Sequence, residues 1–150
     1  MHQLKYKDRP DVGQYLGKVY GAMLRQAPAF ESVELILPVP LHERRLRQRG
    51  YNQSAAFAEG LAQAWGIPFD DKALRRTQHT ETQTHKSRIE RFDNVSAAFA
   101  VAQAETLQGK HLLLVDDVLT TGATLEACGL KLLEIPGTRL SLATIAIADH

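Results

Sequence analysis

The stretch LLLVDDVLTTGATL, residues 112–125, decides the fold. Its apolar run is typical of a strand in a parallel sheet that is covered on both faces. Two adjacent carboxylates, Asp116 and Asp117, follow directly, and a Thr/Gly segment comes next at 120–124. Ligands in open α/β sheets bind at the carboxyl ends of strands, and a following helix offers free N–H groups and the positive end of its dipole. The stretch therefore predicts a ligand site at a strand end.

The residue types in this stretch favour a phosphorylated sugar as the ligand. Gly122 lets the backbone approach an anion closely, and threonine hydroxyls can donate to phosphate oxygens. Carboxylates repel phosphate but accept hydrogen bonds from sugar hydroxyls. Asp and Thr are also common caps of turns and helices, so the motif alone leaves a purely structural role equally open. A Walker-type ATPase lacks support because the chain has no G-x-x-x-x-G-K-[ST] loop.

The rest of the chain alternates helical and strand patterns, which predicts a single α/β domain with a mainly parallel sheet. The first expected helix has Leu16, Val19, Tyr20 and Met23 at helical spacing, and the third has Leu125, Cys128, Leu132 and Leu133 on one side. We interpret residues 41–50 as an arginine-rich loop. The expected helices are 12–25, 51–65 and 122–135, and the expected strands are 35–37, 110–115 and 139–148, with further strands near 67–69 and 97–101.

The composition is that of an ordinary soluble globular protein, with 44% hydrophobic and 23% charged residues among 150. The net charge of +1 does not by itself indicate a nucleic-acid or membrane surface. The single cysteine, Cys128, excludes an internal disulfide and a cysteine-built zinc site, and we interpret it as a core residue. The chain shows no signal peptide and no apolar run of about 20 residues, so we expect a cytoplasmic protein without a membrane span.

LLLVDDVLTTGATL resembles the phosphoribosyl-pyrophosphate (PRPP) motif of type I phosphoribosyltransferases. Three further stretches, LKYKDRPDVGQYLG, LPVPLHERRLRQRGYNQS and TETQTHKSRIERFDNVSAAF, resemble the ComF/GntX-like competence-protein family in the same order. The resemblance implies one Rossmann-like, phosphoribosyltransferase-like domain over 1–150, with a hood and flexible lid at about 70–97. Two features depart from the pattern. The cysteine-rich zinc-binding segment that opens many family members is absent, and Ala123 stands where many related enzymes have a second glycine.

The resemblance also implies roles for individual residues. Asp116 and Asp117 would bind the ribose and act in catalysis together with Arg88 of the lid, where Gln83, Lys86, Arg91 and Asn94 also match the family. The residues implied for the 5′-phosphate are Thr120, Thr121, Gly122, Ala123 and Thr124. Those implied for pyrophosphate are Pro40, Leu41, His42, Arg44 and Arg49. No protein side chain is predicted to bind a metal, since Mg²⁺ would arrive with PRPP.

Three functions remain open at this point. The first is a phosphoribosyltransferase that moves phosphoribosyl to or from a nitrogen nucleophile and releases or takes up pyrophosphate. The second is a non-catalytic competence or DNA-uptake protein that binds a nucleotide, single-stranded DNA or a protein partner. The third is a regulatory domain that senses PRPP or a nucleoside monophosphate without turnover. The sequence leaves the acceptor base or amine unidentified and is compatible with a dimer.

Overall fold

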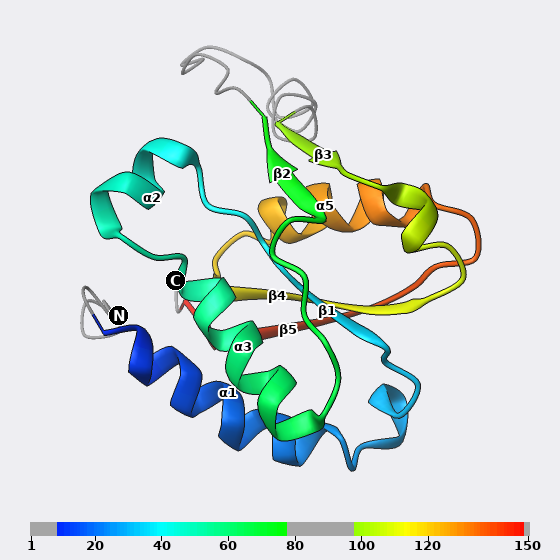
Figure 1. Ribbon diagram of the computed structural model, residues 1–150, viewed down its shortest axis with the longest axis horizontal. Coiled ribbons are helices and arrows are strands. Elements are labelled where there is room, and N and C mark those ends of the chain that lie inside the picture. The colour runs from blue at the N-terminus through cyan, green and yellow to red at the C-terminus, as the bar shows by residue number, and fades with distance from the viewer. Residues whose placement is uncertain (1–8, 78–97, 149–150) are drawn as a thin grey trace.

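The computed structural model describes residues 9–77 and 98–148 and contains a central sheet of three parallel strands. In spatial order these are β1 (Leu35–Pro38), β4 (His111–Leu119) and β5 (Arg139–Ile147). Helices α1 (Pro10–Leu24) and α3 (Gln53–Trp65) lie on one side of the sheet, and α5 (Ala123–Leu133) lies on the other (Figure 1). The predicted α/β class and the mainly parallel sheet are confirmed.

Smaller elements complete the described chain. A two-stranded antiparallel sheet, β2 (Leu74–Arg76) with β3 (Phe99–Val101), lies on the α5 side (Figure 1). Two 3₁₀ turns, η2 (Pro28–Phe30) and η3 (Ala104–Thr106), occur in connections. The strand expected near 67–69 is a single parallel bridge between Ile36 and Phe69, which extends the free edge of β1 by one pairing.

Both faces of the sheet are buried, as the unbroken apolar runs of β1 and β4 require. Leu112 and Leu114 point into the cluster beneath α5, whereas Leu113 and Val115 point into the cluster beneath α3. All four are fully buried. Cys128 of α5 lies in the first cluster, and burial, followed by the negative charge of Asp116, raises the pKa of its thiol to about 12. The interpretation of Cys128 as a core residue is therefore confirmed, while Leu133, expected beside it, is exposed.

Helix α1 packs against α3 through glycines, which corrects the sequence-based prediction. Its buried residues are Gly13, Gly17 and Gly21, one on each successive turn. A Cβ at Gly17 would overlap the Phe57 carbonyl oxygen, so the two helices are in backbone contact there. The predicted apolar face was wrong in part. Tyr20 packs on the core against Phe57 of α3, but the glycines centre the contact so that Val19 and Met23 are exposed.

Two further predictions about local structure were wrong. The arginine-rich segment is not a loop: it contains α2 (Glu43–Arg49), which starts where His42 Nδ1 accepts the Arg44 backbone N–H and ends at Gly50 with φ 86°. Strand β4 does not end before the aspartates but continues to Leu119. Its neighbour β1 stops at Pro38, opposite Val115, whereas β5 keeps pairing as far as Ile147. The acidic pair therefore lies on a strand that has a partner on one side only.

The predicted hood and lid, 70–97, lies partly outside the described residues. Its first part ends in strand β2, and residues 78–97 are not described. None of the described helices is long and apolar enough to span a membrane.

Candidate functional site

The acidic pair lies at the carboxyl edge of the sheet, where β4 has passed the end of β1. The Val39 backbone N–H donates to the Val115 carbonyl at 2.8 Å, so the chain leaving β1 turns away next to Asp116. Asp116 Oδ1 accepts two hydrogen bonds, from the Ser54 hydroxyl at 2.9 Å and from the Asp117 backbone N–H at 2.8 Å. Asp117 Oδ1 accepts the Val118 backbone N–H at 2.8 Å. Both of these bonds to Asp116 are therefore made by one carboxylate oxygen.

Asp116 titrates near neutrality in this environment. Burial, followed by the adjacent charge of Asp117, raises its pKa from 3.8 to about 7, while the Ser54 hydroxyl acts in the opposite direction. Two carboxylates this close cannot both ionise freely in a poorly solvated site. Strongly perturbed carboxylates of this kind are common at functional sites. Near neutral pH Asp116 can therefore hold a proton or accept one.

The Thr/Gly segment joins the acidic strand to helix α5. Gly122 has φ 83° and is the N-cap of α5, which begins at Ala123. The Thr121 hydroxyl accepts the Ala123 backbone N–H at 3.3 Å. The N–H groups of a first helical turn have no partners within the helix and favour an anion. Asp116, Thr120, Gly122 and Thr124 line a hollow of about 30 Å³, so one of the two aspartates and three of the five predicted phosphate residues share one small depression. Asp117, Thr121 and Ala123 do not line it.

The structure places the predicted pyrophosphate residues in different surroundings. Pro40, Leu41 and His42 lie in the half-buried connection from β1 to α2. His42 and Arg44 line an open cleft of about 430 Å³ together with Arg45, Gln48 and Arg76. Arg49 is at the other end of α2, where its guanidinium donates to Gln53 Oε1 at 2.8 Å. It does not line this cleft.

Arg76 is a candidate that sequence reasoning missed. It belongs to β2, where it faces α2 across the cleft, and its guanidinium lies 5.1 Å from the centre of the Phe99 ring. Desolvation, followed by the nearby charge of Arg45, lowers the pKa of Arg76, and Asp116 acts in the opposite direction. The ion pairs found among the described residues are Arg9–Asp11 and Arg47–Glu43, so Arg44, Arg45 and Arg76 have no carboxylate partner there. Arginines without a carboxylate partner around one cleft have the charge and the donors that an anion requires.

Other predicted residues lie outside the described part of the chain. These are Arg88, proposed for catalysis, and the lid residues Gln83, Lys86, Arg91 and Asn94. Within residues 9–77 and 98–148, no group of three or more His, Cys, Asp or Glu side chains could hold a metal ion.

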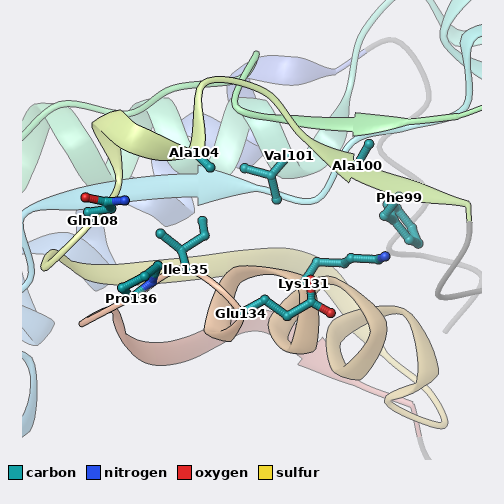
Figure 2. Close-up of a pocket in the computed structure, with 9 residues that line it drawn as sticks. All are labelled: Phe99, Ala100, Val101, Ala104, Gln108, Lys131, Glu134, Ile135 and Pro136. Carbon is teal, nitrogen blue, oxygen red and sulfur yellow. The ribbon is translucent and has the colours of Figure 1, made fainter.

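A second cleft, of about 420 Å³, lies between β3 with η3 and the C-terminal half of α5 (Figure 2). Its lining includes Phe99, Val101 and Ile135, with Lys131 and Glu134 along the α5 side. Lys131 is eight residues beyond the start of α5, which corresponds to roughly 12 Å along the helix. This cleft therefore lies apart from the acidic pair and holds none of the predicted site residues.

The fold and the site together define a class of protein: an α/β domain whose sheet edge presents an acidic pair, a Thr/Gly helix start and an arginine cleft. A family model described as "Phosphoribosyl transferase domain" matches residues 52–149. The match spans more than half of the chain and includes the acidic pair and the Thr/Gly segment. The chain belongs to the phosphoribosyltransferase domain family.

Curated relatives carry names that refer to DNA use and competence. The chain is 35% identical over 127 residues to "DNA utilization protein YhgH" of Salmonella typhimurium, covering 83% of this chain and 55% of that protein. It is 31% identical over 129 residues to "Competence protein F" of Haemophilus influenzae, covering 83% of this chain and 56% of that protein. The resemblance to the competence-protein family is thus confirmed. The chain spans about half the length of these relatives.

Solved structures with the same fold are phosphoribosyltransferases and a related amidotransferase. Adenine phosphoribosyltransferase of Saccharomyces cerevisiae matches with a TM-score of 0.60 at 19% identity, covering 97% of this chain and 74% of that one. The glutamine PRPP amidotransferase of Bacillus subtilis matches with a TM-score of 0.58 at 24% identity, covering 88% and 26%. At these identities the similarity establishes the fold alone.

Proposed function

We propose that this domain binds PRPP with its Mg²⁺ and transfers the phosphoribosyl group to or from a nitrogen nucleophile. The single observation that carries the proposal is the acidic pair at the open end of β4, directly before the Thr/Gly start of α5. A ligand with hydroxyls at its centre and a phosphate at each end fits this order of groups. The ribose hydroxyls donate to Asp116 and Asp117, and the 5′-phosphate lies against residues 120–124.

The basic cleft supports the pyrophosphate end of this proposal. Arg44 and Arg76 line opposite sides of it, and guanidinium groups bind phosphate oxygens through two parallel hydrogen bonds. Pyrophosphate, the leaving group, would lie towards this cleft. Its departure leaves positive charge on the anomeric carbon, which the negative charge of the acidic pair stabilises. Asp116 has a pKa of about 7, so it is the described carboxylate suited to accept a proton from the nucleophile.

Magnesium fits this site as a companion of the substrate. Mg²⁺ takes oxygen ligands and usually binds through one or two carboxylates together with phosphates and water. The described residues offer no group of three or more His, Cys, Asp or Glu side chains for a metal ion, so Mg²⁺ would be held by the oxygens of PRPP. When bound, the ion would neutralise pyrophosphate charge. The work of this chain is to orient the ribose and the two phosphate ends.

A thermal-shift screen followed by calorimetry tests the proposal. PRPP, pyrophosphate and nucleoside monophosphates are added with and without Mg²⁺, and a ligand at about 100 times its Kd adds about 2.7 kcal/mol to the free energy of unfolding. We expect stabilisation by Mg-PRPP and its loss in Asp116→Asn/Asp117→Asn, with the double variant still folded by circular dichroism. Unchanged PRPP affinity in the double variant would show that the acidic pair is not the ribose site.

A second candidate, supported by the names of the curated relatives and by the basic cleft, is a non-catalytic protein that binds single-stranded DNA. The DNA backbone would then occupy the arginine cleft. Oligonucleotide affinity that falls steeply with salt, without pyrophosphate release from PRPP in the presence of any base, favours this alternative. Release of pyrophosphate on adding a base favours the transferase, and tight PRPP binding without turnover favours a sensing domain.

A further inference from the structure

The first turn of α3, residues 52–54, touches both halves of the proposed PRPP site. Asn52 is the N-cap of α3, and its Oδ1 accepts the Ser54 backbone N–H at 3.0 Å. The other end of the same amide, Nδ2, donates to the Val39 carbonyl at 3.0 Å, in the connection that leads to His42. Ser54 in turn donates its hydroxyl to Asp116 Oδ1 at 2.9 Å. One helical turn therefore bonds to the pyrophosphate side and to the ribose side.

These hydrogen bonds involve buried residues, which makes their loss costly. Among the described residues the buried polar side chains are Gln53, Ser54 and His111, and two of these three belong to this turn. A buried polar group that loses its partner is costly, so it holds its partner in one geometry. Gln53 accepts from Arg49, which also connects the turn to the end of α2. The buried face of α3 is therefore apolar except in this first turn, where polar side chains bond to other segments.

We propose that Asn52 and Ser54 are positioning residues that set the spacing between the pyrophosphate loop, residues 39–42, and the acidic pair. Asn52 holds the loop by its carbonyl. Ser54 fixes the orientation of the Asp116 carboxyl group through the hydrogen bond to Oδ1. The proposal rests on the proposed function, because it assigns to these residues the geometry of the PRPP site.

Ser54→Ala tests the ribose side. Loss of a donor to a carboxylate favours its protonated form, so we expect the pKa of Asp116 to rise above that of the wild type. Carboxyl carbon NMR measures this titration in the ligand-free protein. In calorimetry, Mg-PRPP affinity at pH 7 should fall about tenfold or more, as for the loss of a hydrogen bond to a charged group. Ser54→Thr, which keeps the hydroxyl, should restore both values.

Two substitutions of Asn52 separate the loop contact from helix capping. Ser is as good an N-cap as Asn, but its side chain is too short to keep the bond to the Val39 carbonyl. We expect Asn52→Ser to lower the Tm slightly, through the lost bond to the Val39 carbonyl, while amide exchange in the loop 39–42 becomes faster and pyrophosphate affinity falls at least threefold. Asn52→Ala should show the same losses together with a larger fall in Tm, because it also loses the N-cap. If Asn52→Ser leaves loop exchange and pyrophosphate affinity unchanged, Asn52 is a helix cap and no more.

The outcomes distinguish this proposal from the proposed function. If the wild-type protein binds neither Mg-PRPP nor pyrophosphate, the proposed function fails. The titration of Asp116 and the exchange of the loop amides still report whether the α3 turn holds both. If the wild type binds Mg-PRPP and Ser54→Ala changes neither the pKa of Asp116 nor the affinity, the positioning proposal is overturned while the proposed function stands.

Discussion

Asp116 belongs to the proposed ribose site, and its buried charge destabilises the fold. Its carboxyl group is largely buried beside a second carboxylate, and the pKa of about 7 records how poorly the charged form is stabilised there. Enzymes commonly keep such groups where charge is needed for chemistry, at the expense of stability. The effect of Asp116 on stability depends on the difference between its pKa in the folded chain and its pKa in the unfolded chain.

Asp116→Asn should stabilise the ligand-free protein at alkaline pH. The pKa of Asp116 is higher in the folded state than in the unfolded state. The contribution of Asp116 to the free energy of unfolding is therefore most favourable below pH 3.8, falls as the pH rises towards about 7 and stays low above that. The amide keeps an oxygen for the Ser54 and Asp117 donors, so the cost disappears without loss of those bonds. At pH 8 we expect a gain on the order of 1–3 kcal/mol in urea unfolding.

The pH dependence of this gain distinguishes it from a general effect of charge removal. It should vanish near pH 4, where the wild-type Asp116 is protonated in the folded state. Asp71→Asn, at an exposed carboxylate, is the matched control and should give no comparable gain. A gain of equal size at pH 4 and pH 8 would contradict the burial of charge as its cause.

Arg76 allows a test of the basic cleft without touching the acidic pair. Arg76→Gln should lower affinity for inorganic pyrophosphate by roughly fivefold to thirtyfold, equivalent to one or two kcal/mol. Arg44→Gln should act in the same direction. Arg47→Gln, on the same helix but paired with Glu43, is the control and should change affinity little. Calorimetry with pyrophosphate measures all three, and equal losses in the three variants would show that only overall charge matters.

Single residues of the candidate site differ in how well the sequence alone predicts them. Asp116, Asp117 and Gly122 stand in one contiguous motif whose order has a chemical meaning, so they can be found from the chain alone. Arg76 has no such context, because it joins the cleft only when the β2–β3 hairpin brings it opposite α2. The contact of Ser54 could not be predicted for a related reason: its partner, Asp116, is 62 residues away in the sequence.

At the scale of elements, the α1–α3 pair depends on glycines for close approach. Gly17→Ala gains up to about 1 kcal/mol of helix propensity, but its Cβ would overlap the Phe57 carbonyl oxygen and lie 2.8 Å from the Leu61 backbone nitrogen. Backbone atoms of a packed helix cannot move cheaply, and overpacking typically costs about 1–3 kcal/mol. We therefore expect net destabilisation of about 1–2 kcal/mol by urea unfolding.

Gly13→Ala is the matched comparison on the same helix face. Its Cβ would meet the Ala56 methyl group at 3.3 Å, a contact that a small shift relieves. The propensity gain then roughly offsets the strain, and stability should stay within about 0.5 kcal/mol of the wild type. Equal destabilisation in both variants would argue against backbone contact at Gly17 as the cause.

Element prediction failed where two patterns competed. In α1 the apolar residues at helical spacing and the Gly13–Gly17–Gly21 repeat indicate faces that overlap only in part. The glycines and Tyr20 face the core, whereas Val19 and Met23 are exposed. In α2 the density of arginine suggested a loop, although Gly50 as a C-cap was visible in the sequence. Strand β4 extends past its apolar run because β5, a partner distant in sequence, continues alongside it.

At the scale of the whole molecule, the carboxyl and amino ends of the parallel strands carry different groups of polar residues. The carboxyl edge carries the acidic pair and the open cleft. At the amino edge, His111 joins three segments: its Nδ1 bonds to the Ser32 hydroxyl and its Nε2 to the Ser141 hydroxyl, both at 2.7 Å. Arg139 also donates to Ser32 at 3.1 Å. This buried node ties the start of β4 to β5 and to the chain before β1.

His111 should make the fold sensitive to acid. Burial, followed by the charge of Arg139, lowers the pKa of His111, and Glu34 acts in the opposite direction. A group whose folded pKa is depressed gives stability that is present above its unfolded pKa of 6.5 and is lost as the pH falls through the folded value. We expect His111→Gln to be less stable at pH 7.5 but to lose less stability between about pH 6.5 and pH 5.

Asp116 changes stability in the opposite direction over the same range, so the measurement belongs in the Asp116→Asn background. There, urea unfolding at several pH values, with His111 intact and with His111→Gln added, isolates the contribution of the imidazole. Arg139→Gln in the same background removes the positive charge beside His111. This variant should lose less stability on acidification than the protein in which His111 and Arg139 are both intact. If the three proteins lose stability in parallel as the pH falls from 6.5, then protonation of His111 does not limit the amino edge, and the acid sensitivity of the fold comes from other groups.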